Sequence, residues 1–288
     1  MIKLIATDMD GTLLNAAHEI SEENQQAIRY AQEQGITVVI ATGRAFYEAN
    51  TPVAETELKV PYICLNGAEV RDETFNIMST SHLNHELVHK VTSKLKEEDI
   101  YYQIYTNRGI YTEDPQRDLD IYIDIAERAG QKADVEKIKN GIQKRIKNGT
   151  LKVVDSYDAI EDIPGELIMK VLAFNPDLGK MDRVGQELAT SPNLAISSSS
   201  RGNLEITHSD AQKGIALETI AERLGVKMEN VMALGDNLND MSMLERVGYP
   251  VAMENAAPEV KAIATYTTDT NENSGVGKAI MKLIDQKK

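Results

Sequence analysis

The chain has 288 residues, a length that suits one large α/β domain or two domains. Hydrophobic residues make up 42% and charged residues 26%, which excludes a disordered or collagen-like chain. The formal net charge of -14 disfavours binding to duplex DNA or anionic lipid, so an anionic substrate would need a local Lys or Arg or a metal ion.

Cys64 is the single cysteine, which excludes an intramolecular disulfide, and its apolar neighbours indicate a buried thiol. The N-terminus shows no targeting signal, and no apolar run approaches the roughly 20 residues of a membrane helix. These features predict a cytoplasmic protein with no membrane partner.

Residues 1–84 predict a βαβ unit followed by a third strand. Two short apolar runs at 2–7 and 36–41 flank a helix that Ser21 can cap and that ends at Gly35. Unbroken apolar strands joined by a helix indicate a parallel sheet covered on both faces. The third strand is expected at 62–65.

The middle of the chain differs in texture, with a tyrosine-rich strand and hairpin at 101–111, lysine-rich helical stretches at 119–147 and a strand at 167–174. We therefore expect residues 85–193 to form an inserted α+β domain. Four serines at 197–200 are compatible with either an edge strand or a hinge.

Alternating elements return near the C-terminus. A helix at 213–224 is followed by a strand at 230–234 and a short helix at 240–247, and the pattern continues at 250–253 and 275–284. Residues 1–84 and 194–288 are thus predicted to form one α/β core around a parallel sheet.

Two acids follow the first predicted strand, in the segment Asp8-Met9-Asp10-Gly11-Thr12. This segment lies at the carboxyl edge of the expected sheet, where open α/β sheets bind their ligands. Both carboxylates can point into one crevice, and Gly11 permits a sharp turn. Asp8 can then act as a nucleophile and Asp10 as an acid and base, with an ordinary Asp-Gly turn as the alternative.

Three further motifs are expected near the same edge. In ATGR (41–44), a hydroxyl and backbone N–H groups ahead of a helix can hold phosphate oxygens, although Thr42 could simply cap the helix. Lys213 begins a helix and is either a phosphate ligand or a solvated lysine. GDNLND (235–240) adds two carboxylates and two amides at a third strand end.

Four carboxylates would therefore meet at one edge, from Asp8, Asp10, Asp236 and Asp240. Like charges so close would raise pKa values unless a divalent cation compensates for them. Oxygen ligands and a phosphate substrate point to Mg²⁺, and Lys213 supplies the remaining positive charge.

These motifs together resemble a known family. DMDGTLL (8–14), ATGR (41–44), QKG (212–214) and GDNLND (235–240) look like the four motifs of the haloacid dehalogenase superfamily. NSGVGKAI (273–280), Asn66-Gly67-Ala68 and the insertion between the second and third motifs resemble its Cof-type branch of sugar-phosphate phosphatases. The resemblance implies a Rossmann-like core with a mobile α/β cap of the type inserted between those motifs.

The resemblance also implies roles for individual residues. Asp8 would attack phosphorus to form an aspartyl-phosphate, and Asp10 would protonate the leaving oxygen and then activate water. Magnesium would be held by the Asp8 carboxylate, the Asp10 backbone carbonyl and Asp236, with Asp240 beside them or bound through water. Phosphate or substrate contacts would come from Met9, Thr42, Gly43, Arg44, Asn66, Lys213 and Asn239.

The expected activity is a magnesium-dependent phosphatase for small phosphorylated metabolites, with sugar phosphates as the implied class and a cap that closes over them. The alternatives are a phosphotransferase or mutase on the same scaffold and a non-catalytic protein that binds phosphorylated metabolites. Neither nucleic acid nor an obligate protein partner is expected.

Three weaker patterns have ordinary explanations. His85 and His89 have a spacing that could bind zinc, but exposed histidines are common near domain joins. The segment GVGK (275–278) lacks parts of a nucleotide loop and is expected to begin the last helix. His208, ahead of the third motif, is expected to be a structural histidine.

Overall fold

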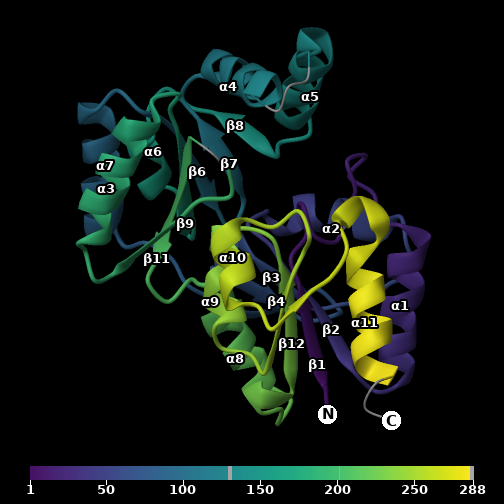
Figure 1. Ribbon diagram of the computed structural model, residues 1–288. Helices are drawn as coiled ribbons and strands as arrows, with labels where there is room; N and C mark the ends of the chain where they lie inside the picture. Colours follow the sequence, from purple (N-terminus) through teal and green to yellow (C-terminus); the bar gives the residue numbers. More distant parts are fainter. Residues whose placement is uncertain (129–131, 201, 286–288) are drawn as a thin grey trace. The chain divides into compact units, whose positions relative to one another are not determined.

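The computed structural model describes residues 1–128, 132–200 and 202–285 (Figure 1). The chain forms two compact units: the first comprises Met1–Ser81 and Asp210–Lys288, and the second His82–Ser209. Each unit has its own cluster of buried apolar side chains. None of the helices in the described ranges combines the length and apolarity that a bilayer crossing requires.

The first unit is built on an eight-stranded sheet in the order β14-β13-β12-β1-β2-β3-β4-β5. The pairs from β14 to β3 are parallel, and β4 and β5 add an antiparallel edge. Its strands are β1 (Leu4–Thr7), β2 (Thr37–Ala41), β3 (Tyr62–Cys64), β4 (Glu69–Arg71), β5 (Ile77–Thr80), β12 (Val231–Gly235), β13 (Tyr249–Ala252) and β14 (Tyr266–Thr267).

Helices cover both faces of this sheet, with α1 and α11 together on one face and α8, α9 and α10 on the other (Figure 1). The core is therefore the α/β arrangement expected for buried parallel strands. The helices of the first unit are α1 (Glu22–Glu33), α2 (Phe46–Ala54), α8 (Lys213–Arg223), α9 (Met241–Leu244), α10 (Pro258–Ile263) and α11 (Gly275–Asp285).

Local signals determine where the first helix begins and ends. The Ser21 side chain accepts a hydrogen bond from the Asn24 backbone N–H, which caps α1, and Ala27, Ile28 and Ala31 form its buried face. Gly35 then turns the chain into β2 with a φ of +76°, a conformation that glycine adopts without steric cost. The predicted βαβ unit is confirmed.

Short 3-10 turns replace or precede some expected regular elements. Leu65–Gly67 forms such a turn after β3, and Leu238–Asp240 forms one before α9. The helix expected at 240–247 is shorter: α9 begins at Met241, directly after the Leu238–Asp240 turn, and ends at Leu244, where turn residues follow. Two further 3-10 turns are Met228–Asn230 and Asn271–Asn273.

The second unit is an α+β domain with a six-stranded sheet in the order β10-β11-β9-β6-β7-β8. All its pairs are antiparallel except β7 with β8. The strands are β6 (Tyr101–Thr106), β7 (Gly109–Thr112), β8 (Leu151–Val153), β9 (Ile168–Phe174), β10 (Leu194–Ser197) and β11 (Asn203–His208). The helices are α3 (His85–Glu97), α4 (Pro115–Arg128), α5 (Val135–Lys147), α6 (Asp158–Glu161) and α7 (Leu178–Ala189).

The inserted unit ends later than the boundary expected after residue 193. β10 and β11 pair with each other, and β11 pairs with β9, so both strands belong to the second sheet. The unit therefore runs to Ser209. Sequence alone did not place the boundary there, because two short strands at an insertion's end look the same whichever sheet they join.

The four serines are divided between an edge strand and a turn. Ser197 ends β10, the edge strand of the second sheet, while residues 198–200 belong to the turn toward β11. In that turn, the Ser198 hydroxyl donates to Asn203 Oδ1 at 2.9 Å and the Ser199 hydroxyl to Glu205 Oε1 at 2.7 Å. The serines thus serve the β10–β11 hairpin.

Candidate active site

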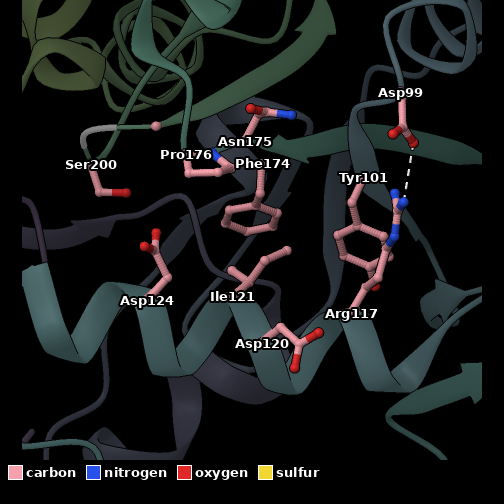
Figure 2. Close-up of a pocket in the computed structure, with 11 residues that line it drawn as sticks. Asp99, Tyr101, Arg117, Asp120, Ile121, Asp124, Phe174, Asn175, Pro176 and Ser200 are labelled. Carbon is pink, nitrogen blue, oxygen red and sulfur yellow. Dashed lines mark hydrogen bonds and ion pairs between the residues drawn. The ribbon is translucent and has the colours of Figure 1, made fainter.

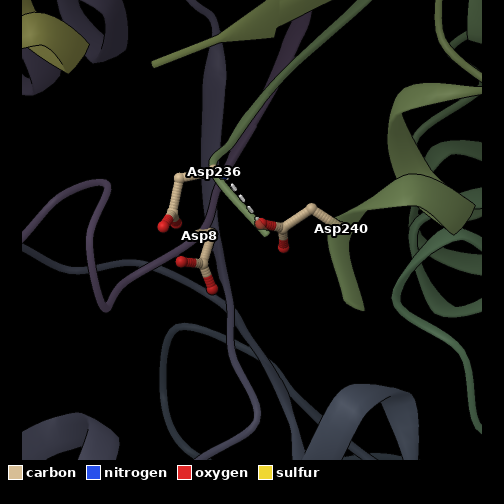
Figure 3. A group of neighbouring side chains, drawn as sticks. All are labelled: Asp8, Asp236 and Asp240. Carbon is tan, nitrogen blue, oxygen red and sulfur yellow. Dashed lines mark hydrogen bonds between the residues drawn. The ribbon is translucent and has the colours of Figure 1, made fainter. Parts of the chain in front are cut away.

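Three acidic side chains of the first unit converge at the carboxyl ends of β1 and β12. One carboxylate oxygen from each of Asp8, Asp236 and Asp240 lies within 4.8 Å of the others. Figure 3 shows the three neighbouring side chains. Asp8 follows β1 directly, whereas Asp236 and Asp240 flank the turn that follows β12. Neighbouring parallel strands end at the same edge, so the topology alone brings these distant segments together.

Lys213, the first residue of α8, is fully buried among these acids. Its Nζ donates to Asp8 Oδ1 at 2.6 Å and to Asp240 Oδ1 at 2.7 Å. Burial by itself lowers the Lys213 pKa, but the attraction of Asp240 and Asp8 outweighs it and raises the pKa above its usual value. Lys213 is therefore a charged member of the site and not a solvated lysine.

Asp240 is fully buried, and both of its carboxylate oxygens already have hydrogen-bond donors. Oδ1 accepts from Lys213, and Oδ2 accepts from the backbone N–H groups of Asp236 at 3.0 Å and Asn237 at 3.1 Å. Asp240 therefore holds the loop that carries Asp236 and positions Lys213, which suits a residue beside a metal better than a direct ligand.

Asp236 is anchored by a residue to which sequence analysis assigned no role. The buried Thr12 hydroxyl donates to Asp236 Oδ1 at 2.8 Å, which joins the β1 loop to the β12 loop. The only sequence signal for Thr12 was its place in the DMDGT motif. A contact between residues so far apart in the sequence cannot be deduced from local spacing.

The carboxyl groups of Asp8 and Asp236 have raised pKa values. Burial raises the pKa of Asp8 well above its usual range, and repulsion by Asp240 adds to the shift although Lys213 opposes it. Burial likewise raises the pKa of Asp236 to about 6, again with a contribution from Asp240. Three acids thus share one buried space with a single ammonium group.

A divalent cation fits this donor set. The oxygens of Asp8 and Asp236 are hard ligands of the kind that Mg²⁺ prefers, and the cluster carries more negative than positive charge when ionised. A cation would relieve the repulsion that raises the two pKa values. Among the described residues, this is the one group of His, Cys, Asp or Glu side chains whose ligand atoms lie close enough together to hold a metal ion.

Arg44 lies at the same edge, where its side chain contacts Asp10. The family resemblance implies a phosphate or substrate contact for Arg44. In the structure its Nε donates to Asp10 Oδ2 at 2.7 Å and its Nη2 donates to Asp10 Oδ1. The Asp10 side chain is 51% exposed, so this pair lies at the margin of the buried cluster.

The remaining candidates join the same loops. The Thr42 hydroxyl accepts a hydrogen bond from the Arg44 N–H at 3.1 Å, and the Thr42 carbonyl accepts from the Asn66 N–H at 3.0 Å. Asn239 Nδ2 lies 3.5 Å from Asn66 Oδ1, which connects the β12 loop with the turn after β3. That turn needs left-handed backbone, and Asn66 has a φ of 58°.

Met9 and Gly43 are brought to the edge through their backbones. The Met9 side chain is fully buried in the core, and its carbonyl accepts hydrogen bonds from the N–H groups of Thr12 and Leu14. Gly43 lies between Thr42 and Arg44, ahead of α2. The sequence-predicted candidates thus lie where β1, β2, β3 and β12 end, and Lys213 reaches them from the start of α8.

Gly11 allows the β1 loop to pass close to Asp236. Its φ is +76°, and a Cβ at this position would lie closer than van der Waals contact to Asp236 Oδ2. Gly11→Ala is therefore expected to lower the free energy of unfolding by roughly 1–3 kcal/mol and to displace Asp236. Phosphate release and chemical denaturation measure the two effects.

Gly35→Ala is the matched control, because Gly35 has the same φ but no neighbouring atom within 4 Å of the added Cβ. It should lose stability while keeping full activity. Equal activity in the Gly11→Ala and Gly35→Ala variants would contradict the close packing of Gly11 against a functional carboxylate.

Within the described ranges, the two histidines that could bind zinc belong to no group of three His, Cys, Asp or Glu side chains whose ligand atoms lie close together. Residues 85–89 read HELVH, a helical spacing also seen in zinc proteases. The ring centroids of His85 and His89 are 6.4 Å apart, and His85 Nδ1 contacts the Glu161 carboxylate. His208 forms the last residue of β11.

A separate pocket of about 340 Å³ lies wholly within the second unit (Figure 2). Tyr101, Ile121 and Phe174 provide apolar surface, and Asp120 lies on the α4 side. The remaining lining residues include Arg117, whose guanidinium donates to Asp99 at 3.1 Å. The tyrosine-rich hairpin that begins at Tyr101 thus starts at a wall of this pocket.

Known proteins of similar sequence belong to one enzyme family. A family model described as haloacid dehalogenase-like hydrolase matches residues 5–280. Phosphatase YwpJ of Bacillus subtilis (strain 168) is 32% identical over 285 residues, covering 98% of this chain and 100% of that protein. From the same organism, 5-amino-6-(5-phospho-D-ribitylamino)uracil phosphatase YwtE is 32% identical over 284 residues, with 98% of each chain covered.

The solved structures give the same result. A haloacid dehalogenase-like hydrolase from B. subtilis has a TM-score of 0.88 and 32% identity, covering 98% of this chain and 100% of that one. A haloacid dehalogenase-like hydrolase from Bacteroides thetaiotaomicron has a TM-score of 0.75 at 28% identity and covers 98% and 100% of the two chains.

Buried carboxylates and a lysine at the strand ends of an α/β core with an inserted domain are compatible with a phosphate-ester hydrolase. The chain belongs to the haloacid dehalogenase-like hydrolases, and it is a phosphatase of that family. The resemblance drawn from the four motifs is confirmed.

Proposed function

We propose that this phosphatase hydrolyses small phosphorylated metabolites, sugar phosphates among them, through an aspartyl-phosphate on Asp8 in a magnesium-dependent reaction. The observation that carries this proposal is the buried group of Asp8, Asp236 and Asp240 around Lys213. It combines a carboxylate nucleophile, a cation for the phosphoryl group and oxygen ligands for a metal within one crevice.

Asp8 is the proposed nucleophile because its second oxygen is not engaged by Lys213, which binds Oδ1. In the first step an Asp8 oxygen forms a bond to phosphorus, the bond from phosphorus to the substrate oxygen breaks, and Asp10 gives its proton to the leaving alcohol. In the second step Asp10 takes a proton from water as the water oxygen bonds to phosphorus. The bond from Asp8 to phosphorus then breaks and releases phosphate.

Mg²⁺ is the proposed cofactor, and it would neutralise charge on the phosphoryl oxygens during both steps. The carboxylates of Asp8 and Asp236 and the backbone carbonyl of Asp10 would hold it. Asp240 keeps Asp236 and Lys213 in place through the contacts described above.

The remaining loops supply the proposed phosphate contacts. The Thr42 hydroxyl and the Gly43 and Met9 backbones come from strand ends, as does the Asn239 amide, and Asn66 lies beside Asn239. Lys213 adds the one ammonium of the buried cluster. Their charge and hydrogen-bonding groups complement a phosphate monoester dianion.

The second unit is the proposed cap that selects the leaving group. An inserted domain can close over a small substrate and limit the access of bulk water to the reacting groups. YwtE and YcsE of B. subtilis are named phosphatases of a phosphorylated ribitylaminouracil, which makes a polyol phosphate a second substrate class to test beside sugar phosphates.

Metal removal tests the cofactor. With EDTA, phosphate release from a panel of sugar phosphates, polyol phosphates and an aryl phosphate is expected to fall by about 100-fold or more and to return with Mg²⁺, because a bound metal supplies several kcal/mol of transition-state stabilisation. Full activity after exhaustive chelation would contradict magnesium dependence.

Stoichiometric phosphate release from one substrate, without transfer to an added sugar, distinguishes hydrolysis from phosphotransfer.

A further inference from the structure

We infer that Arg44 is a positioning residue that fixes the Asp10 carboxylate for proton transfer and does not bind the substrate phosphate. The inference rests on the acid–base role proposed for Asp10. The observation that supports it is the contact of the Arg44 guanidinium with both carboxylate oxygens of Asp10.

The Asp10 carboxylate occupies the edge of the guanidinium, formed by Nε and Nη2, that could otherwise bind a phosphate. Nε meets one carboxylate oxygen and Nη2 meets the other, the side-by-side arrangement that also suits phosphate. Arg44 Nη2 additionally lies 3.4 Å from His18 Nδ1. A guanidinium engaged in this way cannot offer the same edge to a phosphate without releasing Asp10.

Asp10 needs such a partner because its side chain is 51% exposed, in contrast to the buried Asp8. An exposed carboxylate on a short side chain populates several rotamers, and proton transfer requires the one that reaches the leaving oxygen. The Arg44 side chain is only 23% exposed, so it is the more fixed member of the pair.

The backbone of Arg44 is held from two directions. Its N–H donates to the Thr42 hydroxyl at 3.1 Å, and its carbonyl accepts from the Leu65 N–H at 2.9 Å. These bonds join the Arg44 backbone to the ends of β2 and β3. The sheet therefore fixes the position from which the Arg44 side chain extends. Because the Arg44 backbone is held rigidly, its two hydrogen bonds to Asp10 can fix the orientation of the Asp10 carboxylate.

The test compares Arg44→Gln, Arg44→Lys and wild type on two substrates with different leaving groups. An alkyl phosphate needs its leaving oxygen protonated, whereas an aryl phosphate does not. Arg44→Gln should therefore lower kcat for the alkyl phosphate by about 10- to 100-fold with a small change in KM, since acid–base catalysis contributes about 10²–10⁴-fold. Arg44→Lys should recover part of this loss.

With the aryl phosphate, the first step proceeds and hydrolysis of the aspartyl-phosphate becomes limiting. Arg44→Gln should then release one equivalent of aryl alcohol in a burst before slow turnover. A substrate-binding role for Arg44 predicts the opposite pattern, a raised KM for both substrates and no burst, and that result would overturn the inference.

The double variant Asp10→Asn/Arg44→Gln separates this inference from the proposed function. A residue that acts through Asp10 should have little further effect once Asp10 is Asn, so the two losses should not multiply. Unchanged alkyl-phosphate turnover in Asp10→Asn alone would reject the acid–base role itself. A large loss in Asp10→Asn with none in Arg44→Gln would reject only the positioning role. Arg29→Gln, which removes a surface arginine paired with Glu22, controls for the loss of a guanidinium.

Discussion

Replacing Asp8 with asparagine is expected to reduce phosphate release by about 10⁴-fold or more, on the scale seen when enzymes lose a covalent nucleophile. The amide cannot bond to phosphorus, and it also removes one proposed metal ligand. The fold should survive, because Asn is nearly isosteric and Lys213 keeps its contact with Asp240. Phosphate release with the alkyl and aryl substrates measures the loss.

The direction in which Asp8→Asn changes the stability of the fold follows from the raised pKa of Asp8. A carboxyl whose pKa is raised on folding costs stability as pH rises from its unfolded value through its folded value. At neutral pH, in EDTA, the variant should therefore be as stable as wild type or more stable. Asp182→Asn, at an exposed position of α7, serves as the control.

Turnover by Asp8→Asn within 10-fold of wild type would be incompatible with covalent catalysis, given the size of the expected loss.

Replacing Lys213 with methionine is expected to lower the free energy of unfolding by about 3–5 kcal/mol, because it leaves Asp8 and Asp240 buried without their cation. Activity should be lost as well. Chemical denaturation in EDTA measures the stability without compensation by a bound metal. Adding Asp240→Asn to this variant should recover part of the lost free energy of unfolding, because it removes one of the two buried carboxylates left without a cation.

Lys227→Met is the control for that experiment, since its side chain is 81% exposed and pairs only loosely with Glu229 at 3.9 Å. It should change stability by about 1 kcal/mol or less. If Lys213→Met behaved in the same way, Lys213 would not be the cation that balances the buried carboxylates.

Much of the core could be predicted because its signals are local. The Ser21 cap, the Gly35 stop and the flanking apolar runs define β1, α1 and β2, and parallel pairing follows from the helical connection. The inserted unit was harder, because its last strands carry no mark of the sheet they join. Its end at Ser209 became visible only through pairing.

The candidate site divides along the same line. That Asp8, Thr42 and Asp236 meet at one edge could be predicted, because each follows a strand of one parallel sheet. Which atom contacts which could not. The contacts of Arg44 with Asp10 and of Thr12 with Asp236 could not be predicted, because side-chain partners depend on distances that sequence spacing does not encode.

Rapid-quench mass spectrometry of wild type and Asp10→Asn, mixed with an aryl phosphate and Mg²⁺, tests the central claim most directly. An aryl leaving group needs little protonation, so Asp10→Asn should still form the covalent intermediate and accumulate it. The account predicts one phosphoryl group on the peptide that contains Asp8, abundant in Asp10→Asn and transient in wild type. Phosphate release with no phosphorylated Asp8 in either protein, or a phosphoryl group on another residue, would contradict it.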